Sequence, residues 1–268
     1  MKKVVVVIAL LYLPISAFSV RDYLPTILHK EEVAIESIMP KVAVIYLDEA
    51  LDFKKTANNL VSAAKNKEIL GIVLIINNFG GSVGAYSVIH DLIKKVSTIK
   101  PVISLICQGA YSCGYMVASA STYIFAHSLS DVGNIGVLSE ITRYKNPKVK
   151  TNLIADMNVE LLQAGEFKTL HMYYAKDLLP HEKEYLQDIL DQTYQKFLEM
   201  VARNRNLDIT QYKEWAEGKT FIAPEALRLG LIDEIGTIFD VQQKMLSLIT
   251  KKNSNVTYSD DIEFVVME

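Results

Sequence analysis

The chain has 268 residues, of which 50% are hydrophobic and 22% charged, so it can bury the core of one large globular domain and is not a disordered protein. The formal net charge of -3 leaves no surplus of positive charge to neutralise phosphates, which argues against nucleic acid as a partner. Two cysteines, Cys107 and Cys113, are too few for a disulfide framework and have no metal-ligand partner at a recognisable spacing. We therefore expect buried thiols, no metal and no cofactor.

Residues 1–19 have the three-part layout of an export signal. Lys2 and Lys3 precede an uncharged apolar run at residues 4–13, and small residues follow. The run is shorter than the roughly 20 residues that a spanning helix needs, which favours cleavage after Ser19 over a retained anchor without deciding between them. Because the positive end stays in the cytoplasm, the rest of the chain is expected at the periplasmic face of the inner membrane, or in the periplasm.

Short apolar runs alternate with longer amphipathic segments from residue 42 onward. Four runs rich in Val and Ile are typical of buried strands, namely residues 42–47, 70–76, 102–106 and 123–126. Between them, apolar residues recur at helical spacing, first at Ala57, Leu60, Val61 and Ala64 and then at Val88, Ile89, Leu92, Ile93 and Val96. This alternation predicts an α/β domain in which each helix covers one face of a sheet.

The second half of the chain predicts a long helix over about residues 180–204. Its apolar face would consist of Leu186, Ile189, Leu190, Tyr194, Phe197, Leu198 and Val201. A short helix is expected from Pro224 to Leu229, since Gly230 can end it, with a return segment at residues 231–232. We see no internal repeat or dividing linker, and expect a linker at residues 20–40, one domain at 41–250 and a polar or acidic tail at 251–268.

Two loops of the predicted domain have a composition suited to chemistry. Residues 77–82, Asn-Asn-Phe-Gly-Gly-Ser, follow a buried strand and precede a helix, so their glycines let backbone N–H groups approach a ligand; taken alone, they also fit an ordinary turn. Ser112 occupies the same kind of junction after the next strand, where a serine can simply cap a helix. The two loops should lie side by side at one sheet edge, one with a hydroxyl and the other with backbone donors.

Together these motifs make the chain resemble the bacterial signal peptide peptidase A family in its half-length form. In that family a strand ends in an Asn-Ser-Pro-Gly-Gly-type loop, and the nucleophile lies in an Ala-Ser-Gly-Gly-Tyr-type turn after the next strand. Residues 77–81 and 111–115 occupy those places, and Gly-Asn-Ile-Gly-Val at 133–137 matches the Gly-Ser-Ile-Gly-Val motif that follows. Residues 165–168, Gly-Glu-Phe-Lys, match the element that carries the family's basic lysine.

Later landmarks extend the resemblance over roughly residues 40–245. They are residues 194–205 and 221–236, the latter with an Ala-Leu-x-x-Gly-Leu-Ile-Asp core. The resemblance implies a ClpP/crotonase-like α/β fold, a repeated β-β-α superhelix in a single domain.

The resemblance also implies a serine peptidase with a Ser-Lys dyad. Ser112 would be the nucleophile, Lys168 the general base, and the N–H groups of Gly81 and Cys113 the oxyanion donors. Lys168 must be uncharged to accept the proton of the hydroxyl, and apolar neighbours such as Phe167 and Leu170, with Met172 and Tyr173, would favour that form. Half-length relatives complete the dyad between subunits, so a membrane-associated homo-oligomer that cleaves apolar peptides, such as cleaved signal peptides, is expected.

Two departures from the family pattern keep other functions open. Phe79 replaces a proline and Cys113 a glycine, which would fit a catalytically inactive scaffold or binding module on the same fold. A Ser-His-Asp hydrolase could use His127 or His171 with Asp131 or Asp156, although no Gly-x-Ser-x-Gly elbow surrounds Ser112. An acyl-CoA enzyme of the crotonase type shares the superfold but does not fit the export signal.

Overall fold

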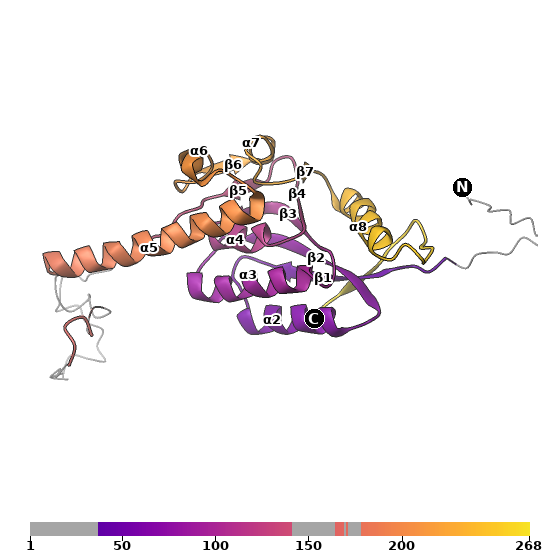
Figure 1. The fold of residues 1–268 in the computed structure, drawn as a ribbon, viewed down its shortest axis with the longest axis horizontal. Helices are drawn as coiled ribbons and strands as arrows, with labels where there is room; N and C mark the ends of the chain where they lie inside the picture. The colour runs from indigo at the N-terminus through magenta and orange to yellow at the C-terminus, as the bar shows by residue number, and fades with distance from the viewer. Residues whose placement is uncertain (1–36, 141–163, 169, 171–177) are drawn as a thin grey trace, which may run out of the picture.

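The computed structural model describes residues 37–140, 164–168, 170 and 178–268 (Figure 1). The expected export signal at residues 1–19 and most of the expected linker lie outside the described residues. Within the described ranges, no helix combines the length and the apolar character that crossing a membrane requires.

An eight-stranded sheet forms the centre of the described chain. Its central order is β6-β5-β3-β2-β1-β8, with β4 beside β3 and β7 beside β4. All neighbouring strands are parallel except β5 and β6. The strands are β1 (Lys41–Leu47), β2 (Ile69–Asn78), β3 (Val102–Tyr111), β4 (Tyr123–Ala126), β5 (Asp131–Gly133), β6 (Thr220–Ile222), β7 (Glu234–Ile235) and β8 (Glu263–Val266).

Helices cover both faces of this sheet. The helices are α2 (Phe53–Lys65), α3 (Val83–Ser97), α4 (Cys113–Ser119), α5 (Pro180–Arg205), α6 (Tyr212–Trp215), α7 (Ala223–Arg228) and α8 (Ile238–Lys252), with a 3₁₀ turn at Ile209–Gln211. Residues of α2, α3, α4 and α5 pack in one apolar cluster with one face of the sheet. On the other face, α8 contributes Val241, Met245 and Ile249 to a second cluster. The parallel strands and their crossover helices bring the strand ends to one edge.

The four predicted strands and the helices between them are confirmed, with differences in detail. The third strand, predicted to end at residue 106, continues to Tyr111. Between the pairs Ile76↔Ile106 and Asn78↔Ala110, β2 advances two residues while β3 advances four, which is a register shift. The buried face of α2 includes Asn59, whereas Val61 is 36% exposed. Asn59 Nδ2 donates to the Met267 carbonyl at 3.3 Å, a partner that hydrophobic spacing does not reveal.

The C-terminal segment contains more structure than its polar composition suggests. Residues Glu263–Val266 form β8, which pairs in parallel with β1 at the edge of the sheet. The sequence predicts the return segment after α7 at residues 231–232, but its strand, β7, is formed by Glu234–Ile235. Leu231 and Ile232 are instead buried in the core. Packing against β1 and β4, rather than the local pattern, defines these two short strands.

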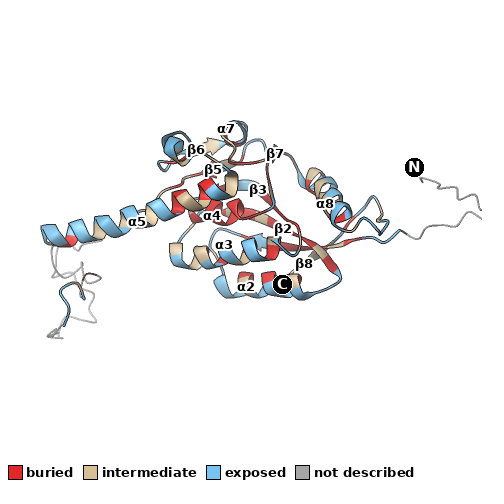
Figure 2. Ribbon diagram, in the orientation of Figure 1, coloured by how far each residue is buried: buried red, intermediate tan, exposed pale blue. Residues whose placement is uncertain are grey.

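Helix α5 extends beyond the body of the molecule (Figure 1). Its buried apolar residues, Phe197, Leu198, Val201 and Ala202, all lie in its C-terminal part, as Figure 2 shows. In the N-terminal part, Tyr185 is 41% and Ile189 42% exposed. The predicted apolar face of this helix therefore packs against the described chain only at one end.

A buried ion pair anchors that end of α5. Arg205 donates from both terminal nitrogens to the Asp233 carboxylate, at 2.9 and 2.8 Å, and from Nε to the Gly230 carbonyl at 3.0 Å. The Asp233 carboxylate also accepts the N–H of Ile124 at 2.7 Å. The pair thus connects α5, β4 and the segment after α7.

We expect Arg205→Ala to lower the free energy of unfolding by about 3 kcal/mol, because it leaves a partly buried carboxylate without its partner. Urea unfolding followed by circular dichroism measures this. Arg228→Ala is the matched control, since Arg228 forms an exposed pair with Glu225 one helical turn away, and it should leave the midpoint unchanged. Equal midpoints for the two variants would show that the Arg205 pair stabilises nothing.

A second buried polar cluster joins α3, α4 and α5. His90 is 5% exposed, with Nδ1 2.8 Å from Asp91 Oδ1 and Nε2 2.7 Å from Asn204 Nδ2. Asn204 Nδ2 also donates to Ser119 Oγ at 3.1 Å. Because Nε2 accepts from the amide, this geometry fits the neutral imidazole, and burial lowers the pKa of His90.

Stability should therefore fall as the pH falls below about 6.5, the ordinary histidine value. As the pH falls, the histidine of the unfolded chain is protonated before the buried His90 of the folded chain, so protonation favours unfolding. Above about pH 6.5 neither state is protonated, and the loss of stability is absent. Unfolding midpoints at pH 7.5 and 5.5 measure the difference for wild type and for His90→Gln. The variant should show a smaller decrease, whereas His127→Gln, at an exposed site, should match wild type.

Candidate active site

Asn78 organises the loop that follows β2. Its side chain is fully buried; Nδ2 donates to the Asp48 carbonyl at 2.6 Å, and Oδ1 accepts the Gly80 N–H at 2.9 Å. The Tyr86 hydroxyl lies 2.8 Å from the same Oδ1 and 2.9 Å from the Gly80 carbonyl. These bonds hold the two-glycine turn in one conformation, with Gly80 at a φ of 89° that favours glycine.

Ser112 lies directly against this loop, in an unusual backbone conformation. Its φ of 52° and ψ of -123° are sparsely populated for a residue with a side chain and cost about 1–3 kcal/mol. Its N–H donates to the Gly133 carbonyl at 2.8 Å, and its carbonyl accepts the Met116 N–H at 3.0 Å. The Ser112 side chain makes no capping hydrogen bond to α4. Ser112 is therefore not an ordinary helix cap, although it stands at the strand-to-helix turn.

The contact between the two loops depends on glycines. A Cβ at Gly80 would lie 2.9 Å from Ser112 Cβ and 3.0 Å from the Tyr111 carbonyl. At Gly114 a Cβ would lie 2.6 Å from the Asn78 carbonyl oxygen. Neither position has room for a side chain, so the sequence permits α4 to begin directly on the loop after β2.

Gly81 and Cys113, the two residues expected to supply oxyanion donors, also meet here. Cys113 is buried, and its thiol donates to the Gly81 carbonyl at 3.5 Å. Burial raises the pKa of this thiol, so it stays protonated near neutral pH. Within the part of the chain that is described, the N–H groups of Gly81 and Cys113 donate no backbone hydrogen bond. The Cys113 side chain, which replaces the family's glycine, is thus buried against the Gly81 turn.

The motif at residues 133–137 supports Ser112 from the other side. Gly133 provides the carbonyl that accepts the Ser112 N–H. Asn134, with a φ of 52°, donates from its backbone N–H to the Lys219 carbonyl at 2.6 Å and from Nδ2 to the Gly218 carbonyl at 3.0 Å. The segment between α6 and β6 thus fixes the motif that in turn fixes Ser112.

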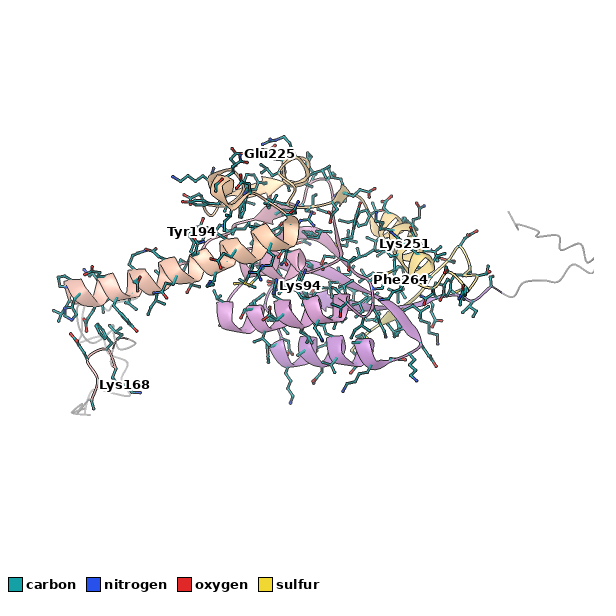
Figure 3. All side chains as sticks on the ribbon, in the orientation of Figure 1. Lys94, Lys168, Tyr194, Glu225, Lys251 and Phe264 are labelled. Carbon is teal, nitrogen blue, oxygen red and sulfur yellow. The ribbon has the colours of Figure 1, made fainter. Side chains whose placement is uncertain are left out.

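Lys168 lies beside the N-terminal end of α5, away from the body of the molecule (Figure 3). The ring of its neighbour Phe167 stacks on Tyr185 at 4.4 Å between centroids, and Glu166 pairs with His181 at 3.2 Å. The C-terminal part of the helix contacts α4, where Asn204 donates to Ser119. Asn204 lies about 28 Å farther along the helix axis than Tyr185, at 1.5 Å per residue. One chain therefore does not bring Lys168 to its own Ser112.

The expected apolar surroundings of Lys168 are described only in part. Lys168 is exposed, and Leu170 is buried, while Met172 and Tyr173 lie outside the described residues. Any pocket that removes the charge of Lys168 must include groups beyond those described in this chain.

The alternative triad receives no support from the described residues. His127 is exposed, and none of the side-chain hydrogen bonds among described residues joins it to Ser112 or Asp131. Asp131 instead accepts the Tyr111 hydroxyl at 2.7 Å, which raises the pKa of Tyr111 to about 12. His171 and Asp156 lie outside the described residues. Phe79, the other departure, is 56% exposed and packs against Tyr111 with 5.6 Å between ring centroids.

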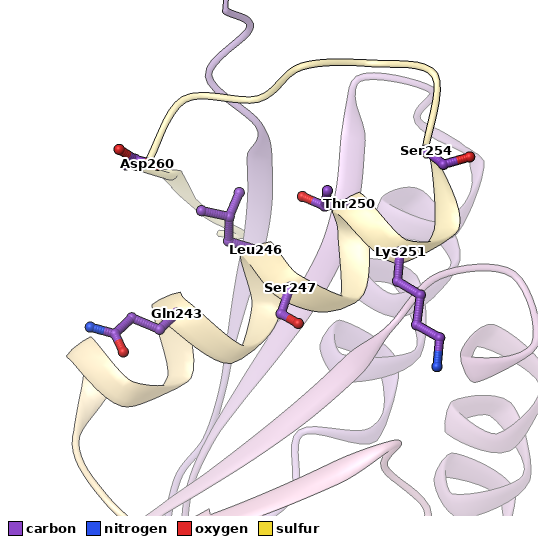
Figure 4. A pocket seen from close by; sticks show the side chains of 7 residues that line it. All are labelled: Gln243, Leu246, Ser247, Thr250, Lys251, Ser254 and Asp260. Carbon is purple, nitrogen blue, oxygen red and sulfur yellow. The ribbon is translucent and has the colours of Figure 1, made fainter. Parts of the chain in front are cut away.

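A hollow of about 720 Å³ lies elsewhere, against the outer side of α8 (Figure 4). Its lining residues are Gln243, Leu246, Ser247, Thr250, Lys251, Ser254 and Asp260. Neither Ser112 nor the glycine loop contributes to it. The backbone geometry at Ser112, rather than this hollow, identifies the candidate active site.

Sequence reasoning missed the residues that hold this site in place. Asn78 was part of the recognised loop, yet its bonds to Asp48 and Tyr86 join segments that no spacing connects. The cluster of His90, Asn204 and Ser119 had no signal in the sequence, because each residue comes from a different helix.

Comparison with known proteins places this geometry in a family. Residues 94–251 match the family model of Peptidase family S49, and residues 29–130 match that of Clp protease. The expected ClpP-like α/β fold is confirmed by the second match together with the parallel sheet.

Individual relatives agree with the family matches. A candidate protease of Methanocaldococcus jannaschii is 30% identical over 79% of this chain and 67% of its own length. Protease 4 of Haemophilus influenzae is 28% identical over 78% of this chain and 33% of its own. The chloroplastic serine protease SPPA of Arabidopsis thaliana is 26% identical over 76% of this chain and 29% of its own length. This chain thus spans about a third of the two longer relatives.

We expect Gly114→Ala to decrease phosphonylation of Ser112 by a serine-directed fluorophosphonate, in which fluoride leaves, at least tenfold, because the added Cβ would displace the first turn of α4 from the Asn78 carbonyl. Mass spectrometry of the labelled protein measures the rate. Gly84→Ala is the matched control, since a Cβ at Gly84 meets nothing within 4 Å. Loss of labelling in Ser112→Ala confirms the labelled residue; labelling of Gly114→Ala at the wild-type rate would contradict the role of this contact.

Proposed function

Because the chain belongs to peptidase family S49, we propose that this serine peptidase hydrolyses apolar peptides, such as cleaved signal peptides, with a dyad of Ser112 and Lys168. The observation that carries the proposal is the backbone of Ser112, held at positive φ with no capping bond and pressed against a two-glycine loop. A strained serine at such a turn is typical of nucleophiles, whose hydroxyl must be exposed to a substrate carbonyl.

The proposed reaction follows from these positions. Ser112 Oγ attacks the scissile carbonyl while its proton passes to Lys168 Nζ, and the N–H groups of Gly81 and Cys113 stabilise the oxyanion. Lys168 then gives the proton to the leaving amine, and water hydrolyses the acyl-enzyme with Lys168 again as the base. The substrate would bind in extended form beside a strand, as peptides commonly bind to sheet proteins.

The dyad is proposed to form between subunits of a homo-oligomer. In one chain, Lys168 lies at the projecting end of α5 (Figure 3), far from α4 (Figure 1), whose N-cap is Ser112. Exposed apolar residues lie along that projecting part, namely Leu179, Tyr185 and Ile189, and they would pack against the next subunit. A closed ring of identical contacts would place each Lys168 at a neighbouring Ser112.

We propose the inner membrane, at its periplasmic face, as the site of action, or the periplasm if the N-terminal segment is removed. The support is the charge and apolar pattern of residues 1–19. An inactive scaffold remains the alternative, and the labelling of Ser112 described above decides between the two.

Mixing two inactive variants tests the shared dyad. Ser112→Ala and Lys168→Ala should each abolish cleavage of an apolar signal peptide, with fragments read by mass spectrometry. After the two proteins are unfolded together and refolded as a mixture, a quarter of the sites combine an intact serine with an intact lysine, so about a quarter of wild-type activity should return.

The controls separate the parts of this proposal. Lys183→Ala changes another exposed lysine near the start of α5 and should retain activity. If each variant is inactive and the mixture is also inactive, the dyad does not form between subunits. Full activity in Lys168→Ala alone would exclude the lysine as the base.

A further inference from the structure

The edge of the sheet where the parallel strands begin is rich in lysine. Helices α2, α3 and α8 run opposite to the strands, so their C-terminal ends reach the same edge as the starts of β1 and β3. We call this surface the amino edge. Its lysines are Lys41, Lys65, Lys67, Lys94, Lys95, Lys100, Lys251 and Lys252. Figure 3 labels Lys94 near the end of α3 and Lys251 near the end of α8.

Most of these lysines are available for an external partner. Lys41 pairs with Glu68 at 3.2 Å, while Lys100 and Lys252 donate to backbone carbonyls of neighbouring loops. The remaining five are exposed and form no ion pair with another described residue. Among the described residues, the same edge has eight lysines and four carboxylates. The carboxylates are Glu68, Asp260, Asp261 and Glu263. The amino edge is therefore positive in a chain whose net charge is -3.

Helix ends alone do not account for this surface. A lysine in the last turn of a helix is favoured by the helix dipole, which explains Lys65 or Lys251 individually. It does not explain large apolar side chains exposed among them, which are Ile38 at 57%, Met39 at 50%, Ile99 at 49% and Val256 at 36%. Lysines interspersed with exposed apolar side chains match the interface of an anionic bilayer, where phosphates attract the charge and the acyl boundary accepts apolar groups.

The course of the chain points to the same edge. The described residues begin at residue 37 and enter β1 from this side (Figure 1). Thirty-six residues precede them, including the apolar run at residues 4–13. The hollow beside α8 also opens here, and Ser247, Thr250 and Ser254 add hydroxyl donors next to Lys251 (Figure 4). Ser112 lies at the opposite edge, where β3 ends.

We propose that the amino edge docks on the surface of an anionic lipid bilayer, with the Ser112 edge directed away from it. This inference rests on the proposed membrane association and adds the surface and the lipid chemistry to it. The lysines bind headgroup phosphates, and the apolar side chains between them enter the interface. The opposite edge stays open to peptides and to a neighbouring subunit.

Vesicle binding of the full chain tests the proposal. The triple variant Lys67→Gln, Lys95→Gln, Lys251→Gln removes three charges from the amino edge. The matched control Lys54→Gln, Lys55→Gln, Lys213→Gln removes three exposed charges elsewhere. Partition is measured by sedimentation with vesicles of 30% phosphatidylglycerol in phosphatidylcholine and with vesicles of phosphatidylcholine alone. Partition to the neutral vesicles measures the binding due to the N-terminal apolar run. The ratio of partition to anionic vesicles over partition to neutral vesicles then measures the electrostatic contribution.

The amino-edge variant should decrease this ratio by roughly a hundredfold, at about fivefold for each lysine near an anionic surface. The control variant should keep the wild-type ratio, and added salt should lower the wild-type ratio. Equal decreases in both variants would show an effect of net charge alone, and no decrease in either would remove the docking surface; both results overturn the proposal. Peptide cleavage in detergent should be unchanged in both variants, so its loss would concern the proposed peptidase instead.

Discussion

The close approach of α4 to the loop after β2 is the constraint on which the rest of the candidate site depends. A Cβ added at Gly114 would lie 2.6 Å from the Asn78 carbonyl oxygen, and one at Gly80 would lie 2.9 Å from Ser112 Cβ. Both positions therefore exclude a side chain. The Asn78 side chain then joins three segments, because Nδ2 donates to the Asp48 carbonyl while Oδ1 accepts from the Gly80 N–H and the Tyr86 hydroxyl. The two adjoining loops supply the Ser112 hydroxyl and the N–H groups of Gly81 and Cys113, which in the proposed function act together on one carbonyl group.

Helix α5 has the opposite character. Its C-terminal end is fixed by Arg205, Asp233 and the His90 cluster, whereas its N-terminal end carries Lys168 and exposed apolar residues away from the body. A rigid helix anchored at one end holds its far end at a defined position without any local contacts. A catalytic group carried there belongs, in our proposal, to the site of a neighbouring chain, which would also cover exposed apolar residues such as Leu179 and Ile189.

Much of the fold could be predicted because short Val- and Ile-rich runs have few alternatives to a buried parallel strand. The runs at 42–47 and 102–106 are examples, and the α5 prediction began at the correct residue. The pattern failed where partners come from distant segments. Asn59 donates to the Met267 carbonyl, β8 pairs with β1 in spite of a polar surrounding sequence, and Ile189 of the α5 stripe stays 42% exposed among the described residues.

The sequence by itself determined the α/β fold, the peptidase family and the choice of Ser112, because those depend on local periodicity and on ordered motifs. Only the tertiary structure decided how Ser112 is held, since its support by Gly133, Gly80 and Asn78 joins segments that are far apart along the chain. It also decided that Lys168 lies far from the serine of its own chain. A motif fixes which residues are present, whereas the distance between two of them depends on every element that packs between them.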